Sequence, residues 1–178
     1  MKEELSSDTV EEKVLFHESQ HFSRLWLSIL LVGVWCFFLL IIPTEDYSEI
    51  RSISDIGAIF TPVFASIILL FLISIRLDTK IKQDGIYVRF FPINIKYRKY
   101  SWRMLDKVFV RKYSALFEFG GWGIRGITNR NRAFNIWGNT GIQLVKKNGN
   151  KLLIGTQKSE EAKEVLNLIE QNNFIKAE

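Results

Sequence analysis

Cysteine and histidine are almost missing from this chain, which has one cysteine and two histidines in 178 residues. Cys36 cannot form an internal disulfide, and it lies in an apolar run where a thiol is unreactive. His17 and His21 would share one face of a helix, but no further histidine or cysteine lies near them to complete a metal site. Residues 77–178 contain neither residue type, which removes the usual pairs of nucleophile and base. We therefore expect no enzyme, no metal and no cofactor.

Carboxylates are the remaining candidates for acid and base chemistry in residues 77–178. We interpret Asp84 as a turn residue. We interpret the others, Asp78, Asp106 and Glu118, as surface residues. Paired carboxylates for catalysis are thus not expected.

Charged residues are missing from two long stretches, 25–42 and 56–75. At a rise of about 1.5 Å per residue, each stretch would form a helix roughly 27 to 30 Å long, close to the hydrocarbon thickness of a bilayer. A short acidic connector, 44–55, separates them. These patterns predict a transmembrane hairpin of two helices.

Basic residues are unevenly distributed around this hairpin. Residues 1–75 carry a net charge of −6 and residues 76–178 carry +11, which together give the chain's +5. Because Lys and Arg mark the cytoplasmic side of a span, we expect a multi-pass protein of the inner (plasma) membrane with both termini in the cytoplasm. The predicted organisation is a cytoplasmic tail at 1–24, the hairpin at 25–75 and a cytoplasmic domain at 77–178.

An alternation of apolar and polar residues begins after the second apolar stretch and predicts β-strands. Asp84-Gly85 and Asn148-Gly149 are typical turn dipeptides of β-hairpins. About seven short strands are expected, and their connections are too short for crossover helices, so we expect an antiparallel sheet. The predicted strands are 77–82, 86–91, 95–102, 105–113, 133–137, 141–147 and 151–156.

A helix is predicted after the last strand. Ser159 can cap it, Glu160 and Glu161 suit its positive end, and apolar residues then recur at spacings of three and four. Glycines are frequent in the earlier segment 116–138. They permit a kink in the sheet there, and a phosphate loop is not expected because no Lys-Ser/Thr ending follows them.

Two segments and one turn resemble those of bacterial pleckstrin-homology-like (PH-like) membrane proteins of uncharacterised function. The segments are Gly120-Gly121-Trp122-Gly123-Ile124-Arg125 and Leu153-Ile154-Gly155-Thr156-Gln157, and the turn is Asp84-Gly85-Ile86. The resemblance covers about residues 77–170. It implies an all-β domain, a sandwich or partly open barrel capped by the C-terminal helix, and it implies no catalytic residues.

Basic and aromatic residues are interleaved near the middle of the chain, a combination that suits an anionic lipid surface. Single-stranded nucleic acid would suit it as well, and solvated strand faces with core aromatics are the simpler explanation. The candidate binding residues are Lys96, Arg98, Lys99, Tyr100, Trp102, Arg103, Arg111 and Lys112.

From this cluster we predict a non-enzymatic, membrane-anchored binding or scaffolding module that engages a protein partner or anionic lipid. Neither nucleic acid nor a small-molecule substrate is expected as a partner. The alternative is a structural subunit of a larger membrane complex that associates through its helix hairpin.

Overall fold

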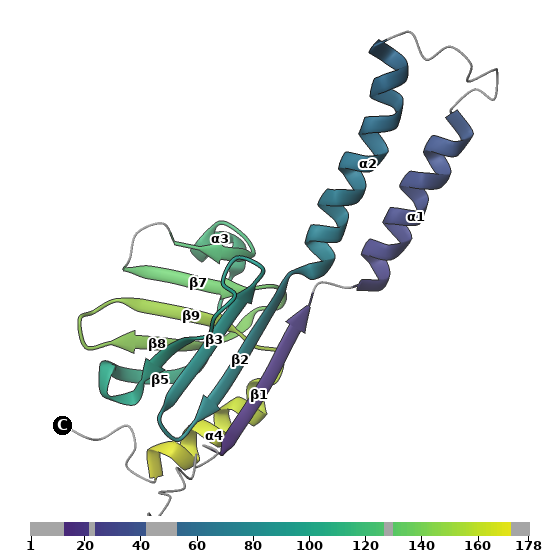
Figure 1. Cartoon of the computed structure of the whole chain (residues 1–178). Helices are drawn as coiled ribbons and strands as arrows, with labels where there is room; N and C mark the ends of the chain where they lie inside the picture. The colour runs from purple at the N-terminus through teal and green to yellow at the C-terminus, as the bar shows by residue number, and fades with distance from the viewer. Residues whose placement is uncertain (1–12, 22–23, 42–52, 127–129, 172–178) are drawn as a thin grey trace, which may run out of the picture.

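The computed structural model describes residues 13–21, 24–41, 53–126 and 130–171. These residues form nine strands in two sheets, two long helices that project from one end of the sheets, and two shorter helices, α3 and α4 (Figure 1).

The first sheet has four antiparallel strands in their order along the chain. They are β1 (Val14–His21), β2 (Arg76–Lys82), β3 (Gly85–Phe91) and β4 (Arg98–Ser101). The turn between β2 and β3 lies at the predicted Asp84-Gly85 pair, and Gly85 has φ 152°. A side chain at Gly85 would collide with the carbonyl oxygen of Tyr100 on β4, so glycine lets these strands approach closely.

The second sheet has five strands in the order β5-β8-β9-β7-β6. They are β5 (Leu105–Lys112), β6 (Gly123–Arg125), β7 (Asn131–Asn135), β8 (Thr140–Lys146) and β9 (Lys151–Gly155). A short 3-10 helix, η2 (Trp102–Met104), leads from β4 into β5. The pairing of β7 with β9 is parallel, whereas we expected only antiparallel pairs.

One main hydrophobic core lies between the two sheets. Its largest fully buried side chains include Leu77, Ile81 and Ile86 of the first sheet and Ile142 and Leu144 of the second. Helix α4 (Ser159–Gln171) contacts β1, β5 and β8 and covers the side where the edge strands β1 and β5 lie (Figure 1). The predicted apolar face of this helix is confirmed, since it buries Ala162, Val165, Leu166 and Ile169.

The long helices α1 (Arg24–Ile41) and α2 (Ile53–Ser74) lie side by side and extend away from the ends of β1 and β2 (Figure 1). The Trp35 indole of α1 donates a hydrogen bond to the Ser66 hydroxyl of α2 at 2.9 Å. Many large apolar side chains on this pair are exposed, among them Leu40 at 86% and Leu25 at 73%. Exposed apolar surface of this extent is larger than isolated surface apolar residues produce.

The predicted transmembrane hairpin is wrong. Within the described ranges, no helix combines the length and the apolar character needed to cross a membrane. The two predicted spans, the integral partnership with a membrane and the multi-pass location in the inner membrane are corrected accordingly.

The β-rich part also differs from the predicted architecture. About seven strands, all antiparallel, were expected in a sandwich or partly open barrel, whereas the described residues form nine strands, one pairing is parallel, and the two sheets are not closed into a barrel. Residues 1–24 were expected to be a tail, but 14–21 form β1, which pairs with β2 along its whole length.

Candidate functional site

A basic pocket of about 520 Å³ lies where β4 of the first sheet approaches β7, β8 and β9 of the second. Four strands and the β8–β9 turn contribute to its lining, and β4 provides three consecutive residues. The lining residues are Arg98, Lys99, Tyr100, Arg132, Lys146, Asn150, Lys151 and Leu152, and we call this the basic pocket. It contains five cationic side chains and, among the described residues that line it, no carboxylate.

Tyr100 stands at the centre of this charge. The Lys146 ammonium lies over the Tyr100 ring, 5.0 Å from its centroid, a distance typical of a cation–π contact. Burial raises the pKa of the Tyr100 hydroxyl, although Arg98 and Arg132 act in the opposite direction. The hydroxyl therefore keeps its proton at neutral pH and remains a hydrogen-bond donor.

One of the five cations is already neutralised. Lys99 forms an ion pair with Asp84, and Asp84 also accepts a hydrogen bond from the Tyr87 hydroxyl at 2.6 Å. The hydrogen bond to Asp84 raises the pKa of Lys99, which holds the ammonium in its charged form. Arg98, Arg132, Lys146 and Lys151 consequently supply most of the positive potential that a ligand would meet.

The structure brings three of the eight predicted binding residues into the basic pocket, namely Arg98, Lys99 and Tyr100. Trp102 is instead a core residue, 4% exposed, whose indole donates to the carbonyl oxygen of Lys82. Lys96 and Arg103 are exposed, and neither lines this pocket.

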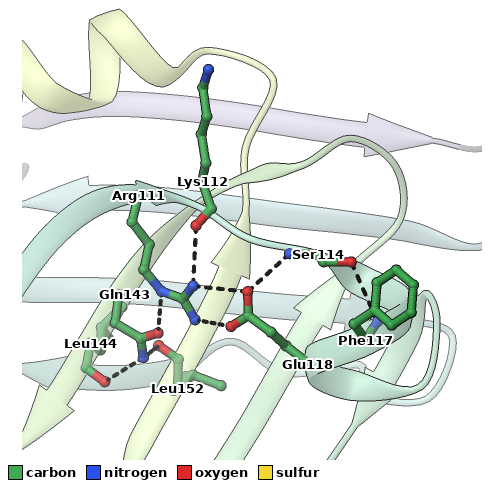
Figure 2. A network of polar contacts seen from close by, with 8 residues as sticks. All are labelled: Arg111, Lys112, Ser114, Phe117, Glu118, Gln143, Leu144 and Leu152. Atoms are coloured by element: carbon green, nitrogen blue, oxygen red, sulfur yellow. Dashed lines mark hydrogen bonds and ion pairs between the residues drawn. The ribbon is translucent and has the colours of Figure 1, made fainter.

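Arg111 and Lys112 are the last two residues of β5 and do not line the basic pocket; Figure 2 shows their surroundings. Arg111 makes a two-pronged ion pair with Glu118, at 2.7 and 3.2 Å, and donates through Nε to Gln143 at 3.0 Å. The hydrogen bonds from Arg111 and from the Ser114 amide lower the pKa of Glu118, so the pair stays charged. The Lys112 side chain points away from this network.

The glycine-rich motif is a helix end and not the expected kink in a sheet. Ser114 caps the short helix α3 (Ala115–Phe119), and Gly120 ends it with φ 72°, a left-handed conformation that glycine adopts without strain. Gly121 and Gly123 also have positive φ. Trp122 stacks on Trp137 at 6.3 Å and is 45% exposed.

Gly155, the remaining motif residue, lies in the second sheet against buried polar side chains. A side chain there would meet Asn135 at 3.1 Å and the Tyr113 hydroxyl at 3.4 Å. Its role in the described structure is therefore one of close packing.

Three cations of the basic pocket were missed by the sequence analysis. The predicted hairpin at Asn148-Gly149 brings Lys146 and Lys151 to the same end of the β8–β9 pair, which was a usable signal. Arg132 follows a polar segment and carries no such signal. Its position depends on the parallel pairing of β7 with β9, which local patterns do not specify.

Neither a family model nor a curated protein nor a solved structure matches this chain. The resemblance to PH-like proteins therefore stays a prediction.

Proposed function

We propose that this protein is a non-enzymatic binding module that holds an anionic ligand of the phosphate type in the basic pocket. The supporting observation is the convergence of five cationic side chains from β4, β7, β8 and β9 on one pocket whose described lining has no carboxylate. Like charges gathered in this way repel one another, and an anion relieves that repulsion.

The donors of the pocket suit a phosphate group. Arg98 and Arg132 offer planar guanidinium groups that match two oxygens at once, and Lys146 and Lys151 add compact charges. The Tyr100 hydroxyl adds a neutral donor. These groups can bind and orient an anion, and the proposal assigns them no catalytic step on the bound phosphate.

A titration of the full chain with inorganic pyrophosphate tests the proposal. Lys146→Glu and Arg132→Glu should each weaken binding at least tenfold, because each removes a charge-assisted hydrogen bond worth about 1.5 to 3 kcal/mol and adds repulsion. Lys163→Glu on the exposed face of α4 is the matched control, since it changes the net charge equally and should weaken binding less than twofold. Equal losses in all three variants would contradict a localised site.

The source of the phosphate is a separate question with its own measurement. Vesicles of phosphatidylcholine with phosphatidylglycerol are compared with vesicles of phosphatidylcholine alone for displacement of bound pyrophosphate. Displacement by the anionic vesicles only would indicate a lipid headgroup, whereas displacement by neither would indicate a free phosphate compound.

A further inference from the structure

A second pocket, of about 380 Å³, opens on the outer face of the five-stranded sheet beside α3. It shares Arg132 and Lys151 with the basic pocket, so the two pockets adjoin at the beginnings of β7 and β9. Phe109, Phe119 and Val145 line the second pocket, and we call these three residues the apolar wall.

The polar groups on the floor of the second pocket are already satisfied by one another (Figure 2). Arg111 is paired with Glu118 and with the side-chain oxygen of Gln143. The Gln143 amide group donates to the backbone carbonyls of Leu144 and Leu152 at 3.3 and 3.2 Å. Because this network is complete in itself, it gives a ligand little reason to place a second charged group there.

What the second pocket offers a ligand is mainly the apolar wall. Phe109 is 43% exposed although it belongs to the middle of β5. An apolar or aromatic group laid on it would remove that surface from water, which favours binding in proportion to the area covered. Pockets of this kind hold a ligand through apolar walls and fix its orientation with a few polar groups.

We propose that the ligand is a phosphate ester with an apolar or aromatic body, and this rests on the proposed function. The phosphate occupies the basic pocket, and the ester's body passes Arg132 and Lys151 to lie against the apolar wall. The two shared cations stand where the phosphate joins the body, so they contact the ligand in either pocket.

Three probes titrated into the full chain separate the two contributions: 1-naphthyl phosphate, inorganic phosphate and 1-naphthol. We expect 1-naphthyl phosphate to bind about tenfold or more tightly than inorganic phosphate, since burial of an aromatic body adds to the affinity. Phe109→Ala should remove most of this difference and leave the affinity for inorganic phosphate unchanged. Met104→Ala, which alters another exposed apolar residue outside both pockets, is the control and should preserve the difference.

The variant Lys146→Glu distinguishes the failure of this inference from the failure of the proposed function. If both phosphates bind equally and Lys146→Glu weakens both, the basic pocket is supported and the apolar wall is overturned as a ligand site. If neither phosphate binds, or if Lys146→Glu changes nothing, the proposed function itself is overturned. If 1-naphthol binds as tightly as 1-naphthyl phosphate, the apolar contact is independent of the phosphate and the inference fails.

Discussion

Asp78 on β2 is a buried carboxylate, 3% exposed, that three neighbouring side chains hold in its charged form. Ser19 donates to its Oδ1 at 2.5 Å, and Arg89 donates to Oδ2 through Nε at 2.9 Å and Nη2 at 2.6 Å. Burial acts to raise the pKa of Asp78, but the hydrogen bonds and the charges of Arg89 and Arg76 outweigh it and lower the pKa below 3.8. The sequence predicts a surface position for Asp78, because it indicates the pairing of β2 with β3 but not the strand β1 on the other side of β2.

The lowered pKa makes stability depend on pH in a defined direction. A carboxyl group with a lower pKa in the folded state contributes stability above its unfolded pKa of about 4, and loses it as the pH falls through the folded value. Asp78→Asn should therefore cost about 3 kcal/mol of unfolding free energy at pH about 7, and its difference from the unmodified chain should shrink below pH about 4.

Urea unfolding of both proteins at a series of pH values measures this dependence. Asp106→Asn on the exposed side of β5 is the control and should change the unfolding free energy little at any pH. A difference for Asp78→Asn that grows as the pH falls would have the wrong sign for the proposed cause.

At the scale of elements, the sequence analysis succeeds where short-range patterns decide the structure. The two turns containing Gly85 and Gly149, with their flanking strands, need only local alternation and backbone conformations that glycine permits. Helix α4 follows from one cap and one apolar stripe.

Strand β1 was missed because the side chains that it buries are partly polar. Phe16, Glu18 and Gln20 point inward on alternate positions, so the inward face does not appear as a hydrophobic pattern. The carboxylate of Glu18, 5% exposed, accepts from the Thr156 hydroxyl at 2.5 Å and from the Gln157 amide at 2.7 Å. Hydrogen bonds from the residues that follow β9 thus help to hold β1 against the rest of the β-rich part. These partners are far from Glu18 in the sequence, so local sequence patterns do not indicate them.

Glu18 gives a prediction about the attachment of β1. Glu18→Ala should leave the Thr156 hydroxyl and the Gln157 amide without their acceptor, which costs about 1 to 3 kcal/mol. Measured by hydrogen exchange, the substitution should accelerate exchange of the β1 amides more than exchange of the β8 and β9 amides. Glu164→Ala, on the exposed face of α4, should leave exchange in β1 unchanged. Equal acceleration in all strands would show that β1 does not open separately.

At the scale of the whole molecule, the distribution of charge in the sequence indicates the kind of ligand, but it does not identify the residues that bind it. The excess of Lys and Arg in residues 76–178 accompanies a basic pocket in the structure, but the eight candidate residues contain only three of the residues that line it. The other five lie outside the basic pocket, and strand alternation does not reveal which face of which sheet meets another sheet. The two stretches were interpreted as membrane spans from their length and their lack of charged residues, and that interpretation was wrong.

The distribution of charge predicts a dependence on salt. Pyrophosphate affinity should fall several-fold between about 0.1 and 1 M NaCl, because the screening length shortens from about 10 to 3 Å. A double variant, Arg132→Gln with Lys146→Gln, should show a weaker dependence because fewer cations face the ligand. Calorimetric titrations at several salt concentrations measure both slopes. Identical slopes would mean that the general positive field of the chain, and not the basic pocket, attracts the anion.

The chain leaves the first sheet at His21 and returns to it at Arg76, and these two residues face each other across the β1–β2 pair. Helices α1 and α2 are inserted in the chain between two adjacent strands, β1 and β2. Because paired strands lie about 5 Å apart, the two ends of the inserted segment start close together. Both ends of the helix pair are therefore joined to one ladder of backbone hydrogen bonds, that of β1 with β2. A chain in which a two-residue turn replaces residues 22–75 would still contain every strand of both sheets.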